Sequence, residues 1–141
     1  IYSAEWKSNT YSTVTISDKT ILPDGSIYLN FNQTGQGTSN LGKYAVSKCS
    51  GNRTDKKGKL LELIVYCEVE LDDSNRFWTK VSRLSGDSDV GVSKFIFLGG
   101  TNNFNELKGK SCTYAVSYFK NKIFGNSKCD ISDELFKKLK N

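Results

Sequence analysis

The clearest structural signal in the chain lies in residues 60–71, which read Leu60-Leu61-Glu62-Leu63-Ile64-Val65-Tyr66-Cys67-Glu68-Val69-Glu70-Leu71. The odd-numbered positions are all apolar: Leu61, Leu63, Val65, Cys67, Val69 and Leu71. The even-numbered positions from 62 onward mix charged and large side chains: Glu62, Ile64, Tyr66, Glu68 and Glu70. Successive side chains of a β-strand point to opposite faces. The alternation therefore predicts a strand whose odd face lies in the core and carries Cys67.

Short runs of β-branched and aromatic residues recur along the rest of the chain, separated by most of its 12 glycines. They predict strands at Tyr11–Ile16, Ser26–Asn32, Gly42–Cys49, Leu60–Leu71, Arg76–Leu84, Ser93–Leu98, Ser111–Phe119 and, more briefly, Phe124–Cys129. This spacing is typical of an all-β sandwich or barrel. Residues 1–141 show no linker, so we expect a single domain.

The strand at 26–32 follows a turn with a clear cause, Pro23-Asp24-Gly25, in which proline presets φ and glycine accepts positive φ. The same alternation rule gives this strand two faces. We expect Ile27, Leu29 and Phe31 to point inward, and Ser26, Tyr28, Asn30 and Asn32 to point outward.

The end of the chain changes to a helical period. Ser132 can cap a short helix over about 132–140, with Asp133 and Glu134 in its first turn. Lys137, Lys138 and Lys140 would occupy its last turn, and both charge placements suit the helix dipole. Leu135 and Leu139 are spaced to lie on one face, so we expect them to dock on the sheet.

Four cysteines allow three disulfide pairings, and the sequence alone leaves all three open. Cys49 and Cys67 straddle one turn, and Cys112 and Cys129 straddle another. An antiparallel hairpin places residues equidistant from its turn side by side, so strand geometry favours Cys49–Cys67 with Cys112–Cys129. Four buried free thiols are the alternative. A zinc site is disfavoured because the cysteines are far apart in sequence and histidine is absent.

The cysteines also suggest a compartment, because disulfides persist in oxidising surroundings. The sequence has no methionine and begins Ile1-Tyr2-Ser3, so we expect that an upstream segment was removed, and with the cysteines we favour a cleaved signal peptide. No apolar run approaches the roughly 18 residues of a membrane-spanning helix. The sequence therefore predicts a secreted or periplasmic protein without a membrane span.

Few residues suit catalysis or metal binding. The lack of histidine removes the Ser-His-Asp and Cys-His arrangements, and we expect no catalytic residues, cofactor or metal. Asp72-Asp73 and Asp87-Ser88-Asp89 offer oxygen ligands for calcium, but neither matches an EF-hand loop, and exposed turn carboxylates are the expected state. Asn32 and Asn52 head glycosylation sequons whose use depends on the source.

The chain carries a net charge of +5, spread over scattered lysines. Basic proteins can bind nucleic acid, and Arg76-Phe77-Trp78-Thr79-Lys80 is the stretch that interleaves aromatic and basic residues. With three arginines in all, a solvated lysine-rich surface is the favoured interpretation, and we expect no nucleic-acid partner.

A longer motif runs from Phe97-Leu98-Gly99-Gly100-Thr101 through Asn102-Asn103-Phe104-Asn105-Glu106-Leu107-Lys108-Gly109 to Cys112-Thr113-Tyr114-Ala115-Val116. It resembles the connection Gly-Gly-Thr-x-x-Phe-x-x-hydrophobic-x-Gly of the allene oxide cyclase-like and dirigent-like β-barrel proteins, a family with small secreted bacterial members. Gly42, Cys49 and Cys67, followed by Asp72-Asp73 and Phe77-Trp78, also resemble the bacterial members. The likeness covers roughly residues 25–130. Asn102-Asn103 and Asp72-Asp73-Ser74-Asn75 depart from the family pattern.

The resemblance implies an antiparallel, lipocalin-like barrel of about eight strands, often oligomeric, with a lumen able to hold an apolar small molecule. No residue here aligns with the polar groups of the cyclase. The leading hypothesis is a non-enzymatic barrel that binds a small apolar ligand or a partner protein. The alternatives are a cyclase- or dirigent-like isomerase and a self-assembling structural subunit, which would form a homo-oligomer. The apolar inward face of residues 60–71 leans toward a packed rather than an open lumen.

Overall fold

A computed structural model describes residues 3–84, 86–87 and 90–141 of the chain. Its strands are β1 (Ser3–Ile21), β2 (Ile27–Ser39), β3 (Tyr44–Lys56), β4 (Lys59–Leu71), β5 (Arg76–Arg83), β6 (Gly86–Asp87), β7 (Val90–Gly100), β8 (Ser111–Phe119) and β9 (Lys122–Ser132). A short 3-10 helix, η1 (Asn102–Leu107), and the helix α1 (Asp133–Lys140) complete the chain.

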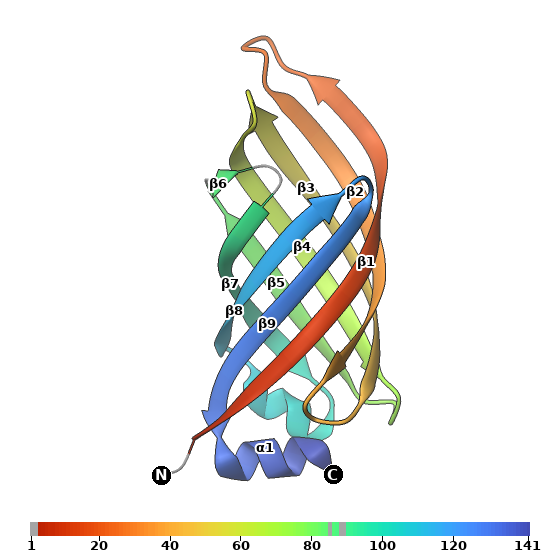
Figure 1. Ribbon diagram of the computed structural model, residues 1–141, viewed down its shortest axis with the longest axis vertical. Helices are drawn as coiled ribbons and strands as arrows, with labels where there is room; N and C mark the ends of the chain where they lie inside the picture. Colours follow the sequence, from red (N-terminus) through yellow and green to blue (C-terminus); the bar gives the residue numbers. More distant parts are fainter. Residues whose placement is uncertain (1–2, 85, 88–89) are drawn as a thin grey trace.

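The long strands form a closed antiparallel barrel of eight strands, in the order β3-β2-β1-β9-β8-β7-β5-β4, and β3 pairs with β4 to close it. Strand β6 is a two-residue addition to the edge of β4. The predicted fold class, an all-β eight-stranded antiparallel barrel with a short C-terminal helix, is confirmed (Figure 1).

Strand lengths differ from the expected ones mainly in β1, which spans 19 residues instead of the predicted Tyr11–Ile16. Its inward positions include serine and threonine as well as apolar side chains, so the sequence offers little apolar alternation there. The pairing with β2 and β9 holds these polar residues in strand conformation. Strand β8 spans the predicted range Ser111–Phe119.

A β-bulge corrects one part of the predicted face of residues 60–71. From Leu63 to Leu71 the odd positions do point inward, as expected, but Leu61 is exposed and Leu60 is buried. The register between β3 and β4 shifts between Thr54 and Asp55, and this shift leaves Leu61 as the extra residue. A bulge reverses which face a side chain occupies, so the prediction for Leu61 was wrong.

Ser26 was also predicted on the wrong side, because it is buried rather than outward. The Asp24 carboxylate accepts hydrogen bonds from the Ser26 backbone N–H at 2.9 Å and from its hydroxyl at 2.6 Å. Gly25 has φ of +86°, as expected for the Pro23-Asp24-Gly25 turn. Ser26 thus belongs to the turn that precedes β2, where the alternation of a strand does not apply.

One end of the barrel is closed by helical segments (Figure 1). The Ser132 side chain caps α1 by accepting a hydrogen bond from the Leu135 N–H at 3.1 Å, as predicted. Leu135 and Leu139 are buried, and they pack with Phe104 and Leu107 from η1. The string 99–109, expected to be a long connection, therefore contains a helical turn that helps to seal the barrel floor.

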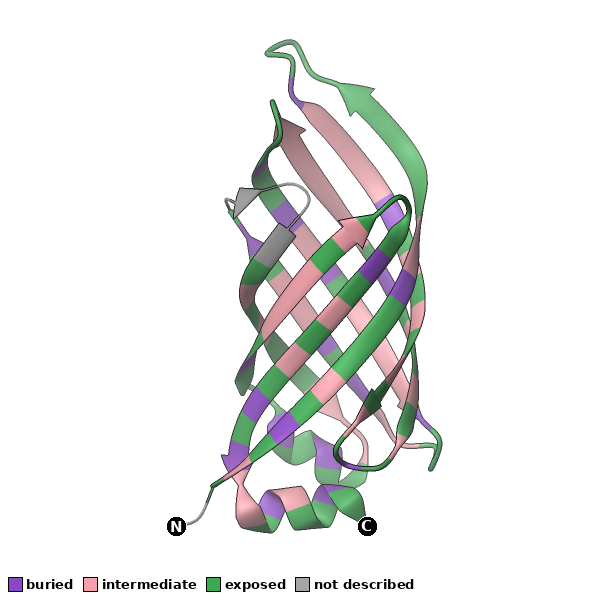
Figure 2. Cartoon of the chain, in the orientation of Figure 1, coloured by how far each residue is buried: buried purple, intermediate pink, exposed green. Residues whose placement is uncertain are grey.

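Aromatic side chains fill the barrel directly above this floor. Trp6 stacks on Phe97 with ring centroids 5.8 Å apart, and its edge contacts Phe77 and Phe104. Figure 2 shows the alternation of buried and exposed residues along the strands that this inward packing produces. The floor of the barrel is packed, and any hollow must lie higher along its axis.

Candidate functional site

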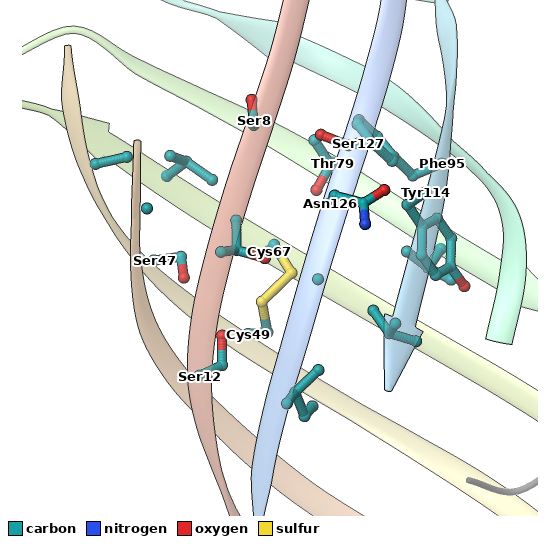
Figure 3. A pocket seen from close by; sticks show the side chains of 18 of the residues that line it. Ser8, Ser12, Ser47, Cys49, Cys67, Thr79, Phe95, Tyr114, Asn126 and Ser127 are labelled. Carbon is teal, nitrogen blue, oxygen red and sulfur yellow. A yellow bond between two sulfur atoms is a disulfide. The ribbon is translucent and has the colours of Figure 1, made fainter. Parts of the chain in front are cut away.

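A cavity of about 220 Å³ occupies the barrel lumen above the aromatic floor. All eight long strands contribute to its wall, and Figure 3 shows side chains that line it. The expectation of a packed lumen, drawn from the apolar inward face of residues 60–71, holds for the floor but not for this middle section. Side chains that alternate inward along paired strands enclose the space.

The wall has two unlike halves. Strands β3, β2, β1 and β9, which are neighbours in the barrel, contribute mainly small and polar side chains. The uncharged polar residues of this half are Ser8, Thr10, Ser12, Gln33, Gln36, Thr38, Ser39, Ser47, Asn126 and Ser127. Strands β4, β5 and β7 contribute mainly aliphatic and aromatic side chains: Val65, Val69, Phe77, Val81, Phe95 and Phe97. The lumen is therefore amphipathic, with an apolar half facing a hydroxyl-bearing half.

The strand registers align hydroxyl groups in a single row that runs from the polar half across β8 to β7. Ser8 pairs with Ser39 on one side and with Ser127 on the other. Ser127 pairs in turn with Tyr114, and Tyr114 with Ser93. A molecule in the lumen thus meets hydrogen-bonding groups on one side and hydrocarbon on the other.

Beside this row, Gly125 stands where the neighbouring side chains leave no room for a larger residue. A Cβ on Gly125 would lie 2.8 Å from Thr10 Oγ1 and 3.3 Å from Val116 Cγ1. Because the first distance is shorter than a normal contact, any larger residue at this position would push into the neighbouring side chains. Gly125 therefore permits close packing of β9 between β1 and β8.

The cavity wall holds little charge. Among the described lining residues, Lys43 is the one charged side chain, and its Nζ lies 2.6 Å from the Asp73 carboxylate. Burial raises the pKa of the Asp73 carboxyl group, but hydrogen bonds from Lys43 and Asn75 lower it more. The net shift of this pKa is downward. Asp73 is thus ionised and paired with Lys43 at neutral pH.

Charges nearer the other end of the barrel are also paired. Arg53 donates to the Asp55 carboxylate through Nε at 2.7 Å and through Nη2 at 2.8 Å, and its guanidinium lies over the Tyr118 ring. Burial lowers the pKa of Arg53, but the interactions with Asp55 and Tyr118 outweigh it and the pKa is raised. This bidentate pair is a fixed part of the structure.

Two hydrogen-bond donors in the cavity wall lack partners. Among the described residues, the Trp6 indole Nε1 and the Tyr114 hydroxyl are the buried side-chain polar atoms without one. Burial raises the pKa of Tyr114 more than the neighbouring Arg83 and Ser93 side chains lower it, so its phenol is neutral at pH 7. An unpaired buried donor costs stability. A water molecule or a bound molecule could satisfy atoms of this kind.

The four cysteines form two cross-strand disulfides in the barrel wall, with the predicted pairing. Cys49 bonds to Cys67 between β3 and β4, and Cys112 bonds to Cys129 between β8 and β9. These are the pairs that hairpin geometry favours. The Cys49–Cys67 bridge faces the lumen (Figure 3), and Cys112–Cys129 lies in the packed core near the floor. Two disulfides are compatible with an extracellular or periplasmic location.

The first calcium candidate, Asp72-Asp73, occupies a turn. The Asp73 carboxylate forms an ion pair with Lys43 Nζ at 2.6 Å and accepts a hydrogen bond from the Asn75 N–H at 2.9 Å. The second candidate, Asp87-Ser88-Asp89, lies partly outside the described residues. Across the described ranges, no group of three or more His, Cys, Asp or Glu side chains gathers as metal ligands.

The remaining sequence motifs lie on the barrel wall and do not gather in the cavity. Of the stretch 76–80, Phe77 and Thr79 face the lumen, while Arg76 is bound to Glu68 and Glu70 on the outer surface. The aromatic and basic residues are thus divided between the two faces. The sequon residues Asn32 and Asn52 are outside the cavity lining, and Asn32 is exposed.

No family model, curated protein or solved structure matches the chain. The resemblance to the allene oxide cyclase-like barrels, and the isomerase and oligomer that it suggests, therefore stay predictions. No helix in the described part of the chain is long and apolar enough to cross a membrane.

Sequence reasoning did not single out the residues that shape this site. Trp6 was not assigned to any predicted strand. Tyr114 fell within the predicted strand Ser111–Phe119 but was not proposed as a site residue. The alternation of side chains could have found Trp6, because even-numbered residues of β1 share one face of the strand. Ser8, Thr10 and Ser12 lie on that face with Trp6. Polar residues on that face read as solvent-exposed, although they line the lumen.

Proposed function

We propose that this protein is a non-enzymatic, secreted or periplasmic binding protein that takes one small, mostly apolar molecule into its barrel lumen. The observation that supports it is the cavity of about 220 Å³ inside a closed barrel with one apolar half. Burying an apolar molecule there gains roughly 25 cal/mol for each Å² removed from water. The sealed floor leaves the opposite end of the barrel as the route of entry.

The size of the cavity limits the occupant. Cavities of about 150 Å³ hold a benzene ring, and pockets for drug-sized molecules range from about 300 to 1,000 Å³. A volume of about 220 Å³ lies between these values and suits a molecule of about one or two rings, or a short chain of similar volume. Secretion is supported by the two disulfides, which an oxidising compartment maintains.

A pair of adjacent substitutions tests lumenal binding. Ser47 lines the cavity, whereas its neighbour Val46 is exposed on the outer face of the same strand. Ser47→Trp would fill the lumen, and Val46→Trp would add the same side chain outside. Acetylnaphthalene, followed by isothermal titration calorimetry, should bind once per chain to the wild type and to V46W, and should not bind to S47W.

Circular dichroism and a thermal melt would show whether each variant keeps the barrel, and Ser127→Phe is a second lumenal block if S47W does not fold. Equal binding by S47W and V46W would place the ligand on the surface. Absence of binding to the wild type, and to a panel of neutral molecules of similar size, would reject the proposal.

A further inference from the structure

We infer that the lumenal ligand is an uncharged molecule that carries a hydrogen-bond acceptor, seated against β9 between the Trp6 indole and the Tyr114 hydroxyl. This inference rests on the proposed function and specifies the chemistry of its ligand. A carbonyl, ether or hydroxyl oxygen on a small hydrocarbon framework has the required character. The position follows from the two unpartnered donors, and the lack of charge follows from the composition of the wall.

Trp6 supplies the first donor at the floor of the cavity. Its side chain is 4% exposed and is held by Phe97, Phe77 and Phe104, so the ring is fixed in position. Its Nε1–H has no described partner, although Trp6 contributes to the cavity wall. Indole nitrogen is a donor only. The group that satisfies it must be an acceptor.

Tyr114 supplies the second donor on the same side of the lumen. Trp6 pairs with Cys129 and Tyr114 pairs with Ser127, so β9 runs between them and the two side chains stand on successive inward rows. The Tyr114 hydroxyl is buried and forms no close hydrogen bond with a described residue, although the side chains of Arg83 and Ser93 lie near it. Ser8 and Ser127 lie in the same row as Tyr114 and can extend the contact to a second oxygen.

The wall disfavours a charged ligand. Lys43 is the one charged lining residue among those described, and Asp73 neutralises it. Arg53 is likewise engaged by Asp55, and Arg83, a buried cation near the Tyr114 hydroxyl, also has interactions within the protein. An ion moved from water into a cavity without an opposite charge loses hydration that neutral hydroxyl groups only partly replace. The anionic head of a carboxylate ligand would therefore stay outside the lumen.

Three probes of nearly equal shape test the inference: ethylnaphthalene, acetylnaphthalene and naphthoate. They differ in having no acceptor, a neutral acceptor and a charged acceptor. Calorimetry on the wild type should show acetylnaphthalene binding about fivefold to tenfold more tightly than ethylnaphthalene, which is the ratio that one or two net hydrogen bonds give. Naphthoate at pH 7 should bind more weakly than either.

Trp6→Phe and Tyr114→Phe remove one donor each and keep an aromatic ring. Each should reduce the ratio of the acetylnaphthalene affinity to the ethylnaphthalene affinity by severalfold. The ratio is the readout because a change in cavity shape affects both probes. Trp78→Phe and Tyr66→Phe are matched controls, because both residues are exposed on the outer face of the barrel. Neither control should change the ratio of the two affinities.

The outcomes separate this inference from the function on which it rests. If ethylnaphthalene and acetylnaphthalene bind the wild type equally, the lumen binds ligand but water satisfies Trp6 and Tyr114, and the inference is wrong. Naphthoate binding as tightly as acetylnaphthalene would refute the uncharged ligand. If none of the three probes binds, the proposed function fails and the inference fails with it.

Discussion

The inward-facing residues of this barrel fall into two kinds, and the difference decides where the barrel is solid and where it is hollow. Near the floor they are large, as with Phe97 and Leu107, which are almost completely buried. In the middle they include Ser8, Ser47 and Gly125, which are too small to meet across the axis. A small side chain on an inward position of a barrel is therefore a sign of a cavity when larger residues close it on one side.

Two adjacent leucines provide a direct test at this scale. Leu60 is 2% exposed and packs with Phe31 and Leu63, whereas Leu61 is 43% exposed at the bulge. Leu60→Ala should lower the free energy of unfolding by about 2–4 kcal/mol, because it leaves a cavity. Leu61→Ala should change it by less than about 0.5 kcal/mol. Urea unfolding of both variants would measure the difference, and equal effects would show that the register lacks this bulge.

At the scale of elements, the barrel floor depends on contacts between turns that are distant in sequence. Lys43 lies in the connection between β2 and β3, and Asp73 lies in the connection between β4 and β5. Leu41, from the first of these connections, is buried in the floor cluster beside Leu71. Together with η1 and α1, the two connections hold the lower rim of the barrel in place.

The Lys43–Asp73 pair gives the protein a specific dependence on acid. The pKa of Asp73 lies below its ordinary value of 3.8 in the folded protein, so the ionised carboxylate favours folding. This contribution is complete above pH 3.8 and is lost as the pH falls through the lower, folded-state pKa. The difference in unfolding free energy between the wild type and Asp73→Asn should therefore be constant near neutral pH. It should shrink as the pH falls below 3.8.

Urea unfolding at a series of pH values between about 2 and 7 would measure that difference, over the range in which carboxyl groups titrate. Asp72→Asn is the matched control, because Asp72 is an exposed neighbour in the same connection. A gap between the wild type and D73N that stayed constant down to the lowest pH would show that the Asp73 charge does not favour folding.

At the scale of the whole molecule, closure of the sheet and the two disulfides act together. The pairing of β3 with β4 removes the free edges of the sheet, and Cys49–Cys67 crosses the same pair of strands. Cys112–Cys129 ties β8 to β9, from which α1 continues into the floor. A closed, cross-linked sheet keeps a cavity open, because its walls cannot collapse toward one another without breaking strand pairs.

Loss of a disulfide should destabilise the whole barrel by a similar amount at either site. The bridges join residues 18 and 17 positions apart. Closing a loop of this size lowers the conformational entropy of the unfolded chain and so stabilises the folded protein by about 3 kcal/mol. The double variants C49A/C67A and C112A/C129A should each lower the unfolding free energy by roughly that amount in urea. A loss below about 1 kcal/mol for both would show that the barrel packing alone supplies the stability.

Residue patterns predicted an all-β fold and several of its local details, and the family resemblance predicted the eight-stranded barrel. Alternation in residues 63–71, the caps and charges of residues 132–140 and the placement of the cysteine pairs around turns are local signals, because strand parity, helix capping and hairpin symmetry depend on neighbours in the chain. The tertiary structure decided the rest. The bulge at Leu61, the inward polar face of β1 and the unpartnered donors of Trp6 and Tyr114 depend on which strands lie beside one another. Serine and threonine on a strand read as surface residues until the sheet closes around them, and only closure turns that face into the wall of a cavity.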